Sequence, residues 1–123
     1  VFHSPIVDFL TLQRKIAAVD INLVPLVKNE FTHCKSELKF FEAAIVKTLT
    51  CATPTFAFEQ AIQANETGFL CDEGEWLMTL EKCVDPTISH PMLERAKDYC
   101  LNTYTPQKQC ANIENVYQQV LES

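Results

Sequence analysis

Six cysteines in a chain of 123 residues constrain its fold more than any other feature of the sequence. The count is even, at least nine residues separate any two of them, and no C-x-x-C pair occurs. This spacing is typical of disulfides rather than of a zinc site or a redox-active pair. Because disulfides persist mainly outside the cytosol, we expect a secreted, extracellular protein with three disulfides. The cysteines are Cys34, Cys51, Cys71, Cys83, Cys100 and Cys110.

The length and composition indicate one disulfide-stabilised domain over 1–123. A 14.0 kDa chain that is 47% hydrophobic can bury a core of its own. The net charge of −6 argues against nucleic acid or an anionic membrane surface as a partner. No apolar stretch approaches the roughly 18 residues of a membrane span. Val1 in place of Met suggests a mature chain, and Asn65 begins an Asn-Glu-Thr glycosylation sequon, which agrees with secretion.

The sequence favours helices over strands. There are only two glycines, and the Asn-Gly and Asp-Gly pairs of β-hairpins are absent. Three prolines follow Ser4, Thr53 and Thr105, which are good N-cap residues, and a proline is tolerated at the first position of a helix. We therefore predict an all-α fold, a compact bundle of five or six helices stapled by three disulfides.

A stripe of apolar residues predicts one long helix over about 25–50. Its members recur at intervals of three and four: Val24, Val27, Phe31, Cys34, Leu38, Phe41, Ile45 and Thr48. Similar patterns predict helices over 5–19, 54–64, 73–84, 91–103 and 106–121. The segments 65–70 and 85–89 are predicted to be loops.

The predicted helices limit which cysteines can pair. On one helix, Cys34 and Cys51 would lie roughly 25 Å apart, far beyond the about 7 Å between Cα atoms that a disulfide permits. The Cys100–Cys110 pair is favoured, because these residues would face each other across a helical hairpin. Two patterns then stay open for the other four: Cys34–Cys71 with Cys51–Cys83, or Cys34–Cys83 with Cys51–Cys71.

No catalytic, metal-binding or cofactor-binding motif is visible, so we expect no enzyme activity, no metal and no cofactor. The three histidines are isolated from one another. A nucleophile elbow, a P-loop and a dinucleotide fingerprint are all absent. Acidic residues after Cys71 suggest calcium superficially, but Trp76 and its apolar neighbours interrupt the spacing of an EF-hand loop.

Because no catalytic motif is visible, we expect a binding function. We predict a secreted, non-enzymatic binding protein, a monomer or weak dimer, that holds a lipid or another small hydrophobic ligand between its helices. Large aromatic side chains are the candidates for lining the cavity: Phe31, Phe40, Phe41, Phe56, Phe58 and Trp76. The alternative is a cytokine-like effector whose helix face docks an extracellular receptor or host protein.

Overall fold

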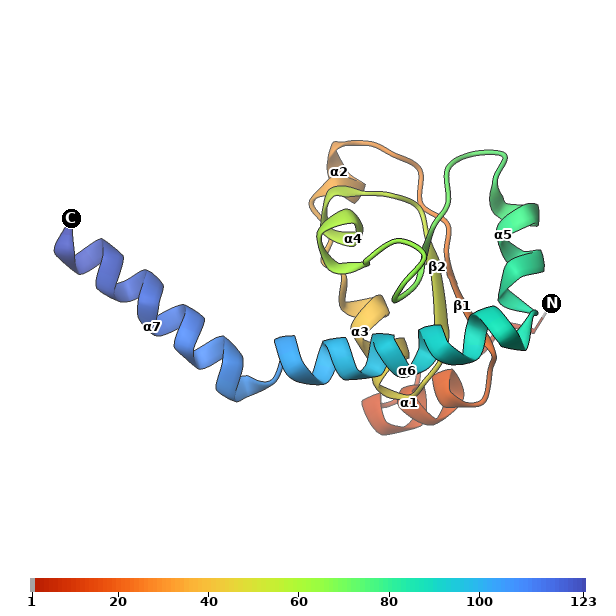
Figure 1. Ribbon diagram of the computed structural model, residues 1–123, viewed down its shortest axis with the longest axis horizontal. Coiled ribbons are helices and arrows are strands. Elements are labelled where there is room, and N and C mark those ends of the chain that lie inside the picture. Colours follow the sequence, from red (N-terminus) through yellow and green to blue (C-terminus); the bar gives the residue numbers. More distant parts are fainter. Residues whose placement is uncertain (1) are drawn as a thin grey trace.

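The computed structural model describes residues 2–123 and is a mixed α/β fold around a three-stranded parallel sheet (Figure 1). The elements in chain order are α1 (Phe9–Ala17), β1 (Ile21–Val24), α2 (Glu30–His33), α3 (Leu38–Ile45), β2 (Leu49–Ala52), α4 (Phe56–Ala61), β3 (Phe69–Leu70), α5 (Trp76–Cys83), α6 (Pro86–Thr103) and α7 (Pro106–Glu122). No helix within residues 2–123 is both long and apolar enough to cross a membrane.

The strands lie in the order β1-β2-β3, so β2 is the central strand. It pairs in parallel with β1 from Ile21–Leu49 to Val24–Ala52, and with β3 over two positions. Helices connect the strands, as parallel pairing requires. Gly68 allows β3 to approach β2 closely, because a Cβ atom there would lie 3.0 Å from the Thr50 carbonyl oxygen.

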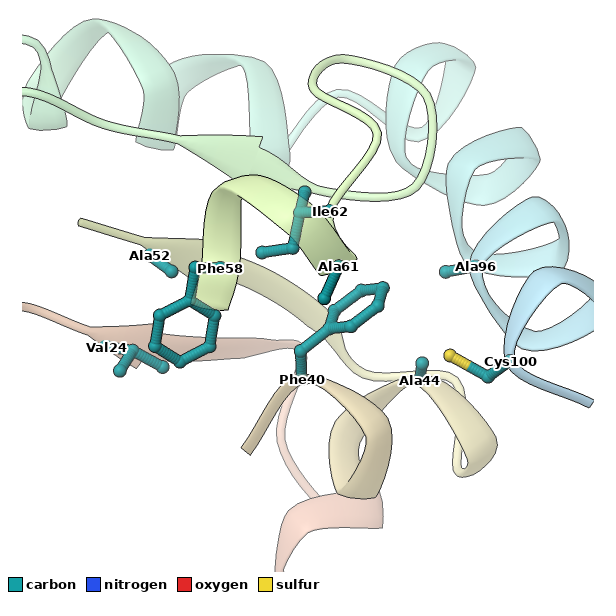
Figure 2. Packing of buried hydrophobic residues seen from close by; sticks show 9 residues of the cluster. All are labelled: Val24, Phe40, Ala44, Ala52, Phe58, Ala61, Ile62, Ala96 and Cys100. Atoms are coloured by element: carbon teal, nitrogen blue, oxygen red, sulfur yellow. The ribbon is translucent and has the colours of Figure 1, made fainter. Parts of the chain in front are cut away.

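Helices cover both faces of the sheet. On β2, Leu49 and Cys51 belong to one hydrophobic cluster and Ala52 to the other, which is the alternation expected of a strand. The first cluster contains Val24, Phe40, Ala44, Ala52, Phe58, Ala61, Ile62, Ala96 and Cys100 (Figure 2). The second contains Leu49, Cys51, Phe69, Cys71, Cys83 and Met92. The sheet therefore packs against α3 and α4 on one face and against α5 on the other, while α6 contributes to both clusters.

The all-α prediction is wrong, and the long helix over 25–50 does not exist. That segment begins just after β1, continues through α2 and α3, and ends within β2. All four residues of β2 are buried. The stripe joined Val24 of β1, residues of α2 and α3, and Thr48 just before β2, because apolar residues of separate elements recur at helical intervals.

A turn without glycine separates α3 from β2. Lys47 adopts the left-handed conformation, with φ of 59°. Its N–H donates to the Ala44 carbonyl at 3.1 Å, and the Thr48 N–H donates to the Ala43 carbonyl at 2.9 Å. These two bonds form a Schellman motif, the usual way to end a helix. Because a lysine holds the position that glycine usually takes, the sequence carried no stop signal there.

The shorter helices were predicted better than the connections. The predictions over 5–19, 54–64, 73–84, 91–103 and 106–121 each overlap an observed helix. The predicted loop over 65–70 contains β3, and the predicted loop over 85–89 is the N-cap and the first turn of α6. Asp85 caps α6 by accepting from the Thr87 N–H at 2.9 Å.

All six cysteines are free thiols, so the three predicted disulfides are absent. Cys51 and Cys83 come close, but their sulfur atoms are 3.2 Å apart, whereas a disulfide bond measures about 2.05 Å. The favoured pair also fails, because Cys100 is buried and Cys110 is exposed. In place of a hairpin, α7 extends away from the rest of the molecule and buries none of its residues (Figure 1).

Candidate functional site

A cleft of about 630 Å³ lies at the carboxyl ends of the three parallel strands. Its lining comes from the segments that directly follow each strand: 25–28 after β1, Thr53 after β2, and 71–73 after β3. Trp76, the first residue of α5, completes it. In open α/β sheets, ligands bind outside the carboxyl ends of the strands. The position of this cleft therefore marks it as the candidate ligand site.

The floor of the cleft is held by hydrogen bonds between adjacent strand ends. Thr53 is buried, its N–H donates to the Val24 carbonyl at 3.0 Å, and its hydroxyl oxygen accepts from the Leu26 N–H at 2.9 Å. These bonds extend the β1–β2 pairing beyond the last ladder residue. The segment after β1 is thereby fixed against β2, and the cleft has a rigid base.

The segment after β3 is fixed in a similar way. The Asp72 N–H donates to the Glu75 carboxylate at 3.0 Å, and the Glu75 N–H donates to the Asp72 carbonyl at 3.1 Å. Gly74 lies between them with φ of 90°, a conformation that L side chains rarely adopt. These two bonds close a turn over 72–75, and Trp76, the first residue of α5, follows it directly.

An ion pair joins the two sides of the cleft. The Lys28 ammonium lies 2.5 Å from a carboxylate oxygen of Asp72. Glu73 adds a second carboxylate to the lining, and Trp76 adds a half-exposed aromatic surface. The cleft thus combines one cation, two carboxylates and one aromatic ring, a set suited to a polar ligand with a flat or cyclic part.

The environment of the buried thiol at this site favours its protonated form. Burial raises the pKa of Cys71, a hydrogen bond from Thr79 opposes this, and the negative charge of Glu75 adds to it. The net effect is a pKa above the ordinary value, so the thiol stays protonated near neutral pH. Among residues 2–123, no group of three or more His, Cys, Asp or Glu side chains is placed to hold a metal ion.

The aromatic residues predicted to line one cavity do not all come together: Phe40, Phe41 and Phe58 meet in the core, and the others lie elsewhere. Phe40 and Phe58 are buried in the first hydrophobic cluster, whereas Phe31 and Phe56 are exposed. Phe41 is half-buried and stacks on Tyr104, with 4.0 Å between ring centroids. Trp76 is the one predicted residue that lines the cleft.

Asn65, the predicted glycosylation residue, is exposed in the turn before β3 and has a φ of 64°. Its N–H donates to the Gly68 carbonyl at 2.9 Å. Asparagine tolerates this left-handed conformation better than most residues. Glycosylation at Asn65 stays a prediction.

Four polar residues of the cleft were not predicted as site residues from the sequence: Lys28, Thr53, Asp72 and Glu73. The signal that could have found them is their position after short apolar or β-branched runs, Ile21–Val24, Leu49–Ala52 and Phe69–Leu70. Once those runs are recognised as parallel strands, the residues that follow them gather at one edge.

The fold and the cleft define a parallel α/β domain with a candidate ligand site at the carboxyl edge of the sheet. No protein-family model matches the sequence, and no curated protein matches it either. Its structure is similar to the crystal structure of the C-terminal domain of a glycosyl transferase group 1 family protein (LpcC) from Francisella tularensis. The TM-score is 0.65 at 20% identity, over 85% of this chain and 53% of that one. The chain thus spans about half the length of that domain and shares its fold.

This fold overturns the prediction of a binding protein built as a disulfide-stapled helical bundle, and with it the alternative of a receptor-docking effector built on the same scaffold. Both rested on an all-α scaffold with three disulfides, whereas the chain has a parallel sheet and free thiols. The extracellular localisation was inferred from the disulfides and stays a prediction without that support.

Proposed function

We propose that this chain forms part of a glycosyltransferase and that the carboxyl-edge cleft binds the nucleotide-sugar donor. The observation that carries the proposal is the position of the cleft, at the carboxyl ends of a parallel sheet whose fold is similar to a glycosyltransferase domain. Nucleotides bind at this edge in many α/β proteins because the loops that follow the strands converge there.

The chemistry of the lining supports this class of ligand. The Trp76 ring offers a surface on which a base or the apolar face of a sugar can stack. The carboxylate of Glu73 can accept hydrogen bonds from ribose or sugar hydroxyls. A volume of about 630 Å³ lies within the range of about 300–1,000 Å³ found for small-molecule sites.

In glycosyl transfer, an acceptor hydroxyl oxygen bonds to the anomeric carbon of the donor sugar. The bond between that carbon and the phosphate oxygen breaks, the nucleoside diphosphate leaves with the electron pair, and the hydroxyl proton is released. The contribution we assign to the cleft is to bind the donor and fix its orientation, which lowers the entropic cost of the reaction.

The test uses Trp76 as its own reporter, because it is the only tryptophan in the sequence. We expect at least one of UDP-glucose, GDP-mannose and ADP-glucose to change its fluorescence saturably. By calorimetry, Trp76→Ala should weaken that binding about tenfold or more, since stacking of a base on an aromatic ring contributes about 1–3 kcal/mol.

Leu77→Ala is the matched control, because Leu77 follows Trp76 on α5 but is exposed and lies outside the cleft. It should bind like the wild type. Absence of binding by all three donors, or equal affinities for the two variants, would contradict the proposal.

A further inference from the structure

The Lys28–Asp72 ion pair crosses the end of the central strand. Lys28 follows β1 and Asp72 follows β3, and these strands flank β2 on its two sides. Both residues line the cleft together with Thr53 at the end of β2. A contact between them therefore passes over the carboxyl end of β2, where a bound ligand would have to lie.

The backbone on both sides of the ion pair is fixed. Asp72 is held by the hydrogen bonds to Glu75 described above. Beside Lys28, Asn29 and Thr32 form a reciprocal capping box, and the Thr32 hydroxyl donates to the Val27 carbonyl at 2.5 Å. The two charged side chains are nevertheless 45% and 60% exposed. The bridge can therefore open by side-chain rotation alone, without rearranging the loops.

The bridge is also weak enough for a ligand to replace it. Ion pairs between exposed side chains contribute little net stability, because water and salt screen them. Lys28 is the only Lys or Arg among the residues that line the cleft in the described chain, beside two carboxylates. An anionic ligand would therefore have one cation to bind, and Asp72 competes with the ligand for that cation.

We propose that Lys28 binds the anionic part of the ligand, a nucleoside diphosphate group, and that Asp72 holds Lys28 across the cleft until the ligand displaces it. This inference rests on the proposed function. It adds that Lys28 strengthens binding of the ligand, whereas Asp72 weakens it. If the ion pair only stabilised the cleft, replacement of either Lys28 or Asp72 would break it, and both replacements would weaken binding.

The experiment measures calorimetric affinity for UDP, GDP and ADP, one at a time, and for the uncharged nucleosides uridine, guanosine and adenosine. Lys28→Gln should weaken binding of the diphosphate on the order of tenfold, in line with the loss of a charged hydrogen bond. Asp72→Asn should strengthen it several-fold, because the competitor for Lys28 is removed. Neither change should alter nucleoside binding by more than about twofold.

The Lys47–Glu94 ion pair provides matched controls. It has the same distance of 2.5 Å and similar exposures of 43% and 60%, but neither residue lines the cleft. Lys47→Gln and Glu94→Gln change the net charge in the same way and should leave diphosphate affinity unchanged.

Weakened binding in both Lys28→Gln and Asp72→Asn, or effects equal to those of the controls, would overturn the inference. If the wild type still binds the diphosphate and Trp76→Ala still weakens that binding, the proposed function survives this result. If the wild type binds neither donors nor diphosphates, the proposed function fails first.

Discussion

Replacing Phe40 by alanine is expected to destabilise the protein by about 3–5 kcal/mol, the usual cost of removing a fully buried phenyl ring. Phe40 is 1% exposed and packs in the first hydrophobic cluster among residues of β1, β2, α3, α4 and α6 (Figure 2). The ring thus connects helices to the sheet, and the cavity left by alanine would remain enclosed by other elements. Urea unfolding followed by far-ultraviolet circular dichroism measures the change.

Phe56→Ala is the control for this experiment. Phe56 begins α4 and is 63% exposed, so its replacement should change the free energy of unfolding by about 0.5 kcal/mol or less. Similar decreases in the free energy of unfolding for Phe40→Ala and Phe56→Ala would contradict the packing of Phe40 in the core. They would be the expected result if both rings lined one ligand cavity, as the sequence had suggested.

Stability is expected to fall steeply as the pH rises above about 9. Burial raises the pKa of Cys51, Cys71, Cys83 and Cys100, the last from 9.0 to about 11. In the unfolded chain these thiols lose their protons near pH 9, while the folded chain keeps them. The unfolded state then binds fewer protons than the folded state, so the free energy of unfolding decreases with pH.

For Cys100 alone, the loss is about 1.4 kcal/mol per pH unit between pH 9 and 11. The measurement is urea unfolding at intervals from pH 7.5 to 10 in the presence of a reductant, with recovery on return to pH 7.5 as the check on reversibility. Cys100→Ala should show a shallower decline than the wild type. A flat profile, or identical slopes for the two proteins, would show that the thiol is not buried in its protonated form.

The helices with an exposed polar face could be predicted from the sequence, and the strands could not. α7 begins at Pro106 after Thr105, as the proline after an N-cap residue predicted, and α5 lies within its predicted range. β1, β2 and β3 contain only four, four and two residues. Runs this short show no periodicity of their own, and the Asn-Gly turns that reveal hairpins do not occur between parallel strands.

The prediction of three disulfides was wrong because the even number of cysteines was taken as evidence of pairing. Four of them are buried, and free cysteine behaves as a small apolar residue in a core. Cys51 lies in β2, Cys71 directly follows β3 and Cys83 ends α5, and the three gather in one cluster without any bond between them. These positions are apolar because they pack in the core beside the sheet, and the sheet was not predicted from the sequence.

The site could be predicted only in part for the same reason. Trp76 was chosen as a large aromatic residue, and it lines the cleft because α5 begins directly beyond β3. Lys28 and Asp72 are 44 positions apart and carry no shared motif. Their meeting depends on the order of the strands, which places β1 and β3 on either side of β2.

The most direct test of the central claim is to map donor binding residue by residue, with amide chemical shifts recorded as UDP-glucose, GDP-mannose or ADP-glucose is added. We predict that the largest shifts fall at 25–28, Thr53 and 71–76, at the carboxyl edge of the sheet. A second cleft of about 450 Å³ lies beside the amino ends of β1 and β2, lined by Asp20, Lys47 and His90 among others. Shifts confined to that cleft, or no shifts with any of the three donors, would contradict the account.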